Sequence, residues 1–530
     1  MRTDAATIDE VLNLTEAAAF IRVSAKTLRE MARRRRVPCQ KVGREWRFLR
    51  RGLEEWLAGE QQSTIVCEPI GVYGQEALFP ETAVDADEKV RTGFGDTAFT
   101  KNRREPLHRW VPWVAGFSAA FVEEVLERTV HDDPSKMLVL DPFAGVGTTL
   151  VEGLKRGYNV IGFEINPYAA LVCQAKTSCV ACRLDRLTEA IRRIEEIRER
   201  RRGGGLEPTS CPPPNFRSRV PFFSPAVQRE VLLVQDVIEK HTTGHVRKML
   251  EVALGAVMVS FSNYSYEPSL STRSAAGKGN IDYADVLKIV CNKLWEMEAD
   301  IGFMQRHMKR FKHKPSAKVC RSSYLENAVG LAPRSVDVLV TSPPYLNNYH
   351  YVRNTRPQLH WLRLVKSTED LKRLETESFG QFWQTVRGGP PIGLSFDLPE
   401  LEDLLQSIRL RNPHKGIYGG AGWANYAAAY FNDCNRFFTV TRRVMRPGGL
   451  VVIVIGNNIV QGIHIATDRF LAEIGRLHGF RVEGMHEVRK KRTGSSIVNS
   501  SVRAGTMKQP IELYETAVEL TAPGRGEPKG

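Results

Sequence analysis

Four consecutive residues, Ser342, Pro343, Pro344 and Tyr345, follow a mostly apolar run at 336–340, with Thr341 between them. The run predicts a buried β-strand, and the prolines end it because proline lacks a backbone N–H and has a fixed φ. The last carbonyl groups of the strand are then left without ladder partners and can hold an amine. Taken alone, the same four residues also fit an ordinary strand-terminating turn.

A second candidate site is a glycine-rich turn between two predicted strands. An apolar run at 137–140 precedes it, a helical stretch at 148–156 follows, and 158–163 is apolar again, which indicates a βαβ unit of a doubly wound sheet. Glycines let the backbone approach a ligand closely, and Glu164 after the second strand is placed to accept hydrogen bonds from ribose hydroxyls. The turn lacks the lysine of a phosphate-binding loop, so a nucleoside such as S-adenosylmethionine fits better than a phosphate-bearing ligand.

Together these residues resemble a known enzyme family. The run Asp-Pro-Phe-Ala-Gly-Val-Gly-Thr-Thr at 141–149 and the loop at 342–345 are similar to motifs of the DNA N4-cytosine and N6-adenine methyltransferases. The stretch 107–118 resembles the family's additional cofactor motif, and 320–323 stands where the family often has an aspartate. The resemblance implies a Rossmann-like α/β fold that binds S-adenosylmethionine, with cofactor contacts from Asp141, Phe143, Gly145, Gly147, Thr148, Glu164 and Asn166.

The resemblance also implies roles in the reaction. The Ser342 oxygen and the Pro343 carbonyl would accept the hydrogens of an exocyclic amine, while Tyr345 stacks on the base. This positions the nitrogen for direct methyl transfer without a covalent intermediate. An amine inside a duplex cannot reach such a loop, so the target nucleotide must be flipped out, with Tyr349 or His350 as further walls.

The target base is predicted from the first residue of the loop. Serine there is more similar to the N4-cytosine group than to the N6-adenine group, so we expect a site-specific DNA methyltransferase that acts on cytosine N4. Adenine N6 is the main alternative. A methyltransferase that acts on RNA guanine and a DNA-binding regulator without catalysis are further alternatives. In this chain the cofactor motif precedes the catalytic loop, whereas many N4-cytosine enzymes have the reverse order.

The N-terminal segment is strongly basic. Residues 22–51 contain twelve Lys or Arg and two Glu, a net charge of +10 out of +15 for the whole chain. Two short helical stretches around Val23-Ser24, the first with Thr15 as its expected cap, predict a helix-turn-helix. The segment resembles the winged modules of the excisionase and MerR-like family, which implies major-groove contacts and phosphate contacts from Lys26, Thr27, Arg29, Arg44 and Arg47.

The composition of the chain and the positions of its Gly and Pro residues predict the remaining domain boundaries. We expect a helix-turn-helix at 1–58, a linker at 59–103, a first methyltransferase part at 104–180, a mostly helical insertion at 181–315, a second part at 316–520 and a disordered tail at 521–530. The residues that read the target are expected in the insertion or in 353–420, and both regions also fit structural loops. The nine cysteines are scattered and predict no metal site. Apolar runs are too short to span a bilayer, so we expect a cytoplasmic protein with double-stranded DNA as partner and a restriction endonuclease or defence-system proteins as possible companions.

Overall fold

The computed structural model describes residues 11–21, 23–33, 37, 39–42, 45–50, 53, 99–113, 116–129, 133–201, 206–266, 269–346, 350–491 and 512–524. The chain divides into two compact units, 1–71 and 72–530. Most of the expected linker, the expected tail from 525 onward, Arg44 and Tyr349 lie outside the described residues.

The described residues of the N-terminal unit form two helices and a small sheet. These elements are β1 (Val11–Asn13), α1 (Leu14–Phe20), α2 (Ala25–Arg33), β2 (Gln40–Val42) and β3 (Glu45–Leu49), with the antiparallel order β1-β3-β2. The expectation that Thr15 caps the first helix is wrong. Asn13 is the cap: its side chain accepts from the backbone of Thr15 and Glu16, and the Glu16 carboxylate accepts from the Asn13 N–H. This reciprocal capping box places Thr15 inside the helix.

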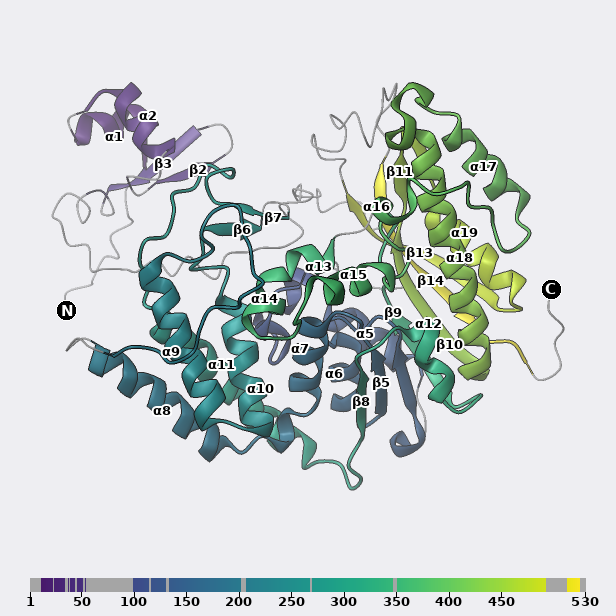
Figure 1. Cartoon of the computed structure of the whole chain (residues 1–530), viewed down its shortest axis with the longest axis horizontal. Helices are drawn as coiled ribbons and strands as arrows, with labels where there is room; N and C mark the ends of the chain where they lie inside the picture. The colour runs from purple at the N-terminus through teal and green to yellow at the C-terminus, as the bar shows by residue number, and fades with distance from the viewer. Residues whose placement is uncertain are drawn as a thin grey trace, which may run out of the picture. The chain divides into compact units, whose positions relative to one another are not determined.

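The second unit is built on a seven-stranded sheet (Figure 1). Its order is β13-β14-β10-β9-β4-β5-β8, in which β10, β9, β4, β5 and β8 run parallel and β14 runs antiparallel to both of its neighbours. This is the mixed sheet of S-adenosylmethionine-dependent methyltransferases, so the predicted fold class is confirmed. The strands are β4 (Leu138–Asp141), β5 (Asn159–Phe163), β8 (Ala317–Cys320), β9 (Val336–Thr341), β10 (Met445–Gly456), β13 (Arg481–Lys491) and β14 (Leu513–Thr521).

Side chains of the central strands alternate between two hydrophobic cores. Val139 packs in one core and its neighbour Leu140 in the other, as the two-residue period of a strand requires. The first core includes residues of α5 (Ala119–Glu127), α6 (Thr148–Lys155) and α7 (Pro167–Thr177). The second includes residues of α12 (Tyr324–Asn327), α17 (Pro399–Arg409), α18 (Gly420–Val444) and α19 (Thr467–Leu477). Helices therefore cover both faces of the sheet.

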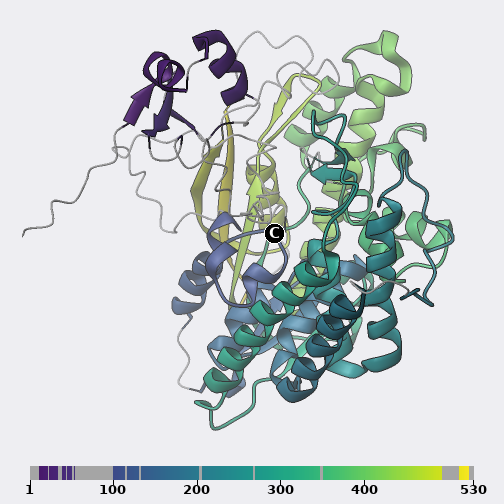
Figure 2. The same cartoon turned by 90° about the vertical axis from the view of Figure 1, so that its left-hand side faces the viewer.

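The segment between α7 and β8 is the expected insertion, and it is mostly helical. It contains α8 (Leu184–Arg201), α9 (Pro225–His241), α10 (Gly244–Val257), a hairpin of β6 (Tyr264–Tyr266) and β7 (Leu270–Thr272), and α11 (Val286–Met308). Figures 1 and 2 show these helices bundled beside the sheet. Their apolar residues belong to the same core as α5, α6 and α7, so the bundle extends the sheet's own core.

Shorter elements connect the strands. They are η1 (Phe99–Arg104), η2 (His108–Trp110), η3 (Pro134–Lys136), η4 (Cys179–Ala181), η5 (Ala328–Gly330), α13 (Tyr351–Asn354), α14 (Arg356–Trp361), α15 (Thr368–Thr376), α16 (Trp383–Val386), η6 (Pro413–Tyr418), β11 (Asn458–Val460) and β12 (Ile463–Ile465). Among the described residues, no helix has the length and apolar character needed to cross a bilayer, and no group of His, Cys, Asp and Glu side chains is arranged to hold a metal ion.

Candidate active site

The strand order places a ligand site at the ends of β4 and β9. The chain leaves β4 toward β5 and β8 on one side, while β9 leads to β10 on the other, so the order reverses between them. In such sheets ligands bind beyond the carboxyl ends of the parallel strands at this reversal. A cavity of about 850 Å³, counting its open part, lies there, and residues one or two positions after the ends of four of these strands line it: Pro142, Phe143, Glu164, Ile165, Ser322 and Ser342.

The glycine-rich turn forms part of the cavity wall. Gly145 and Gly147 have φ of 51° and 87°, in the left-handed region that favours glycine. A Cβ on Gly145 would stand 3.2 Å from Trp113 Nε1, and one on Gly147 would stand 2.8 Å from Cys173 Sγ. Gly145 lines the cavity, whereas Gly147 lets α6 begin close to α7. Glycine at 145 thus shapes the cavity, whereas glycine at 147 allows α6 to pack close to α7.

Glu164 faces the same cavity from the end of β5. Its carboxylate accepts hydrogen bonds from the backbone N–H groups of Gly145, at 2.9 Å, and Asn166, at 2.7 Å. Burial raises the pKa of Glu164 to about 7, and the nearby Asp141 carboxylate adds to the rise. Each carboxylate oxygen has two lone pairs, so Glu164 can still accept hydrogens from a ligand.

Asp141 and Thr148 lie outside the cavity lining, beneath the glycine-rich turn. The Asp141 carboxylate accepts from the Phe143 N–H, at 3.0 Å, and from the Thr341 hydroxyl, at 2.6 Å. Burial raises the pKa of Asp141 to about 6. Because Thr341 directly precedes Ser342, this bond joins the glycine-rich turn to the proline loop. Asn166, by contrast, lines the cavity while its side chain caps α7.

The proline loop contributes Ser342 and Pro344 to the cavity, while Pro343 is buried outside the lining. The Tyr345 hydroxyl donates to a Glu515 carboxylate oxygen at 3.3 Å. A Cβ on Gly456 would stand 3.2 Å from the Tyr345 ring, so the ring packs against that glycine. Tyr345 is outside the cavity lining, and its role as a stacking wall stays a prediction.

Two family models match the chain in separate regions. A helix-turn-helix domain model matches residues 11–61, and a DNA methylase model of the N6/N4 family matches residues 67–175. The curated relative "Type II methyltransferase M.MvaI" from Kocuria varians is 24% identical over 73% of this chain and 84% of that protein. "Type II methyltransferase M.BsoBI" from Geobacillus stearothermophilus is 21% identical over 79% and 87%, and "Type II methyltransferase M.AvaI" from Anabaena variabilis is 22% identical over 77% and 85%.

The chain is an N6/N4 DNA amino-methyltransferase with an N-terminal helix-turn-helix domain. The family uses S-adenosylmethionine, and its substrate is DNA. Both sequence resemblances are therefore confirmed, together with the cofactor.

The cavity of this methyltransferase fits the nucleoside part of that cofactor. Trp113 and Tyr351 both line it, and their rings stack with centroids 5.9 Å apart and planes inclined by 19°. Glu164 stands on the wall as a half-buried acceptor, and the missing side chain of Gly145 leaves room beside Trp113. Ser322 and Ser323 offer hydroxyls where the family often has an aspartate. An aromatic wall, a carboxylate and hydroxyls suit a planar base on a ribose.

Several lining residues come from the connection between β9 and β10, where sequence motifs gave no signal. Phe379 packs edge-on against Phe143, with ring centroids 5.0 Å apart, and Phe382 stacks on His350 at 3.9 Å. Leu374, Glu377 and Ser378 complete this side of the cavity. His350 stacks on a lining residue but is itself outside the lining, so its role as a further wall for the flipped base stays a prediction.

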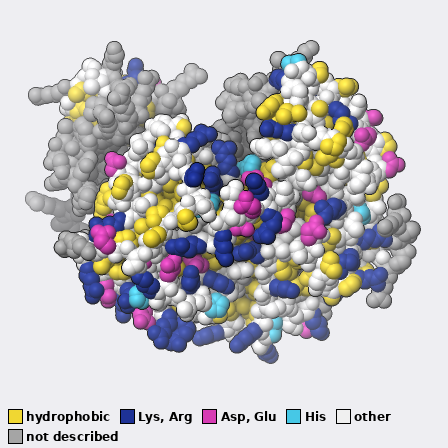
Figure 3. Space-filling model, in the orientation of Figure 1, with side chains coloured by type: hydrophobic (Ala, Val, Ile, Leu, Met, Phe, Trp, Pro, Cys, Tyr) yellow, Lys and Arg dark blue, Asp and Glu magenta, His cyan; other side chains and the backbone are white. Residues whose placement is uncertain are grey.

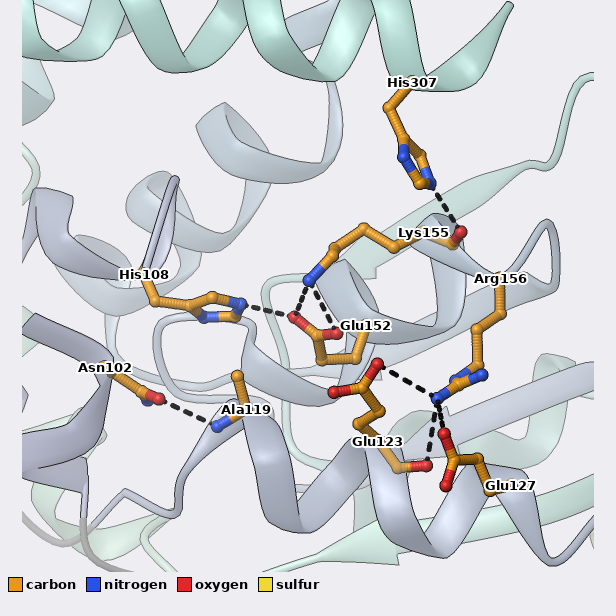
Figure 4. Close-up of polar contacts among 9 residues, drawn as sticks. All are labelled: Asn102, His108, Ala119, Glu123, Glu127, Glu152, Lys155, Arg156 and His307. Atoms are coloured by element: carbon orange, nitrogen blue, oxygen red, sulfur yellow. Dashed lines mark hydrogen bonds and ion pairs between the residues drawn. The ribbon is translucent and has the colours of Figure 1, made fainter. Parts of the chain in front are cut away.

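Buried polar contacts hold the stretch 107–113 against the glycine-rich turn. His108 is buried and its Nε2 lies 2.7 Å from the Glu152 carboxylate, which also pairs with Lys155 on the same helix α6 (Figure 4). On the other side, Asp300 of α11 accepts from the Leu107 N–H and from Arg109 and Trp110. The insertion and α6 thus fix the segment that carries Trp113.

In the helix-turn-helix domain, Thr27 and Arg29 are exposed on α2. The Thr27 hydroxyl lies 2.7 Å from the Ser24 hydroxyl at the start of that helix. Arg47 pairs with Glu45 on β3. The side chain of Lys26 lies outside the described residues, and the DNA contacts of all these residues stay predictions.

Proposed function

We propose that this protein is a site-specific DNA methyltransferase of the type II kind that methylates the exocyclic N4 of cytosine. The observation that carries the proposal is a shared cavity: Ser342 and Pro344 of the proline loop line the same space as Gly145 and Glu164. Ser342, one of the two proposed acceptors for the amine, therefore lies in the same cavity as the wall for the cofactor. The names of the relatives support the type II assignment.

In this proposal the residues act mainly by positioning. S-adenosylmethionine supplies an electrophilic methyl group. The Ser342 oxygen and the Pro343 carbonyl accept the two hydrogens of the amine and turn its lone pair toward the cofactor side of the cavity. Glu164 holds the ribose hydroxyls, and the stacked pair of Trp113 and Tyr351 covers the base of the cofactor. Fixing both reactants in one geometry supplies much of the rate of a direct transfer.

Cytosine is proposed over adenine because serine opens the proline loop, as in the N4-cytosine group. The target nucleotide must leave the duplex to reach Ser342. Lys and Arg side chains gather over β7 and α13 on the face drawn in Figure 3, which favours a polyanion beside the cavity. The helix-turn-helix would add affinity for duplex DNA or regulate the enzyme's own promoter.

The test is methylation of unmodified duplex DNA with labelled S-adenosylmethionine, followed by mass spectrometry of the nucleosides. N4-methylcytosine supports the proposal, and N6-methyladenine would keep the site while correcting the base. Ser342→Ala should lose activity but keep cofactor binding, whereas Ser335→Ala, at the opposite end of the same strand β9, should behave as wild type. Methylated RNA with unmodified DNA, or no product, would overturn the proposal.

The role of the N-terminal domain and of partner proteins needs separate tests. If residues 1–60 guide methylation, deleting them should change the sites that are modified, while unchanged sites would favour a regulatory role. A cognate restriction endonuclease is proposed from the type II names of the relatives. It should fail to cut DNA that the enzyme has methylated, and cleavage at every methylated site would contradict the pairing.

A further inference from the structure

A cluster of aromatic and basic side chains lies next to the cavity in the connection between β9 and β10. The Arg387 guanidinium stands over the rings of Trp383, at 4.3 Å, and Tyr418, at 4.7 Å. Trp383 also stacks on Trp423 of α18, with centroids 5.0 Å apart. Tyr418 remains 54% exposed and its neighbour Ile417 45% exposed. The cluster therefore presents the Tyr418 ring, with Ile417 beside it, to solvent, while Trp423 is buried and Trp383 is half-buried.

The cluster is contiguous with the wall of the active site. Phe382 lines the cavity and stacks on His350, and Trp383 is the next residue along the chain. Trp383 contacts Tyr418, with ring centroids 5.7 Å apart. Figure 1 places α16 at the same end of the sheet as α13 and α15, which also contribute to the cavity. A substrate that extends out of the cavity past Phe382 would meet this cluster first.

The two stretches of chain that form the cluster carry only positive charge. Residues 378–396 contain Arg387 and no acidic residue, and residues 404–432 contain Arg409, Arg411 and Lys415 and again no acidic residue. Arg411 is exposed. Within the described part of the chain, no carboxylate forms an ion pair with Arg387 or Arg411. Basic and hydrophobic side chains lie together in this region of Figure 3. Such a surface is complementary to a polyanion with flat groups.

The segment that carries these side chains is held in one shape. Asn412 and Gly416 have φ of 47° and 53°, and Asn412 donates to the Gln461 side chain at 2.6 Å, which ties the segment to the turn between β11 and β12. A Cβ on Gly422 would collide with the Ile417 carbonyl oxygen, so glycine lets η6 pack directly on α18. A surface fixed in advance loses less conformational entropy on binding.

We propose that Trp383, Arg387, Arg411, Lys415 and Tyr418 form a DNA-contact surface that holds the duplex beside the flipped nucleotide. The inference rests on the proposed function, because it takes the cavity as the place of the flipped base. It assigns the contact to the connection between β9 and β10. In the insertion hairpin, Tyr266 and Leu270 instead bond to Asn354 and so brace α13 from within the protein.

The test compares two double variants of the full-length enzyme that remove the same charge. Arg411→Ala/Lys415→Ala changes the proposed surface. Lys309→Ala/Arg310→Ala changes an exposed basic pair between α11 and β8, at the amino ends of the parallel strands and therefore at the opposite edge of the sheet from the cavity. Binding of a fluorescein-labelled 40-base-pair duplex is measured at several KCl concentrations, with cofactor binding and thermal melting as checks.

Removing two phosphate contacts should reduce the slope of log Kd against log salt by about 1.8, since each contact contributes about 0.9. At physiological salt, DNA affinity should fall about tenfold or more, and the control pair should leave the slope unchanged. Arg387→Lys, which keeps the charge but loses the planar stack, should also weaken DNA binding.

Three outcomes would overturn the surface. The first is that the double variant at 411 and 415 binds DNA as wild type does. The second is that the control pair loses as much DNA affinity, which would reflect bulk charge only. The third is that the double variant loses binding to another protein without a change in DNA binding. If wild type itself neither binds nor methylates DNA, the proposed function fails instead. The two failures are thus distinguishable.

Discussion

Cofactor binding should release a proton from Glu164 near neutral pH. In the free protein, burial raises the pKa of this carboxyl to about 7. Ribose hydroxyls that donate to the carboxylate would favour its ionised form and lower that pKa. At pH 7 the free carboxyl is about half protonated, so binding should release about 0.5 proton, whereas at pH 8.5 the protonated fraction is about 0.03 and the release nearly disappears.

The assay is titration calorimetry with S-adenosylmethionine in two buffers of different ionisation enthalpy. The apparent binding enthalpy should differ between the buffers at pH 7 and converge at pH 8.5. Glu164→Gln should remove the part of the difference that comes from this carboxyl. Below pH 7 the apparent Kd of wild type should rise by up to about tenfold per pH unit, because protons compete for the carboxylate. A wild-type enthalpy at pH 7 that does not depend on the buffer, or a difference that persists unchanged in the variant, would refute the assignment of Glu164 to the ribose.

Three further variants test how the site is held. Thr341→Val removes the hydrogen bond to the buried Asp141 carboxylate and should lower the free energy of unfolding by about 2 kcal/mol at pH 8. This loss of unfolding free energy, measured by urea unfolding, should be smaller at pH 5, because the Asp141 carboxyl, with its pKa of about 6, is mostly neutral there. An equal loss at both pH values would count against a hydrogen bond to the ionised carboxylate. Asp300→Asn should weaken cofactor binding about tenfold. The control Asp285→Asn breaks a comparable carboxylate–arginine pair inside the insertion and should leave the cofactor Kd unchanged. Equal effects of the two variants would show a general loss of stability. Phe382→Ala should raise the KM for DNA and spare the cofactor Kd, and the opposite pattern would place this ring on the cofactor.

The sequence predicted the parts of the fold that local patterns encode. Apolar runs located β4, β5 and β9, and the mostly helical character of the insertion is confirmed. Among the strands of the seven-stranded sheet, β8 and β14 escaped prediction. β8 is four residues long and half of it is exposed, so it has no continuous apolar run. β14 pairs antiparallel between β10 and β13, and a pairing between segments so far apart leaves no local signal.

The residues of the candidate site also divide into those that the sequence predicted and those that it did not. Motif residues such as Gly145, Glu164 and Ser342 were predicted because their types and spacing match a family pattern, and all three line the cavity. Phe379 and Phe382 were missed because aromatic residues in a long connection look like core residues until their neighbours are known. Their partners, Phe143 and His350, lie 236 and 32 residues away along the chain, and only the folded sheet brings them together.

The insertion does more than extend the molecule, because its last helix holds the cofactor segment in place. Leu107 has a φ of 64°, a conformation that a leucine adopts only when its surroundings impose it. Asp300 of α11 supplies that constraint by accepting the Leu107 N–H at 2.9 Å and the Trp110 ring N–H at 3.0 Å. The segment then leads to Trp113 beside Gly145. A movement of α11 would therefore shift the aromatic wall of the cavity, so an insertion that contacted DNA could influence cofactor binding through one carboxylate.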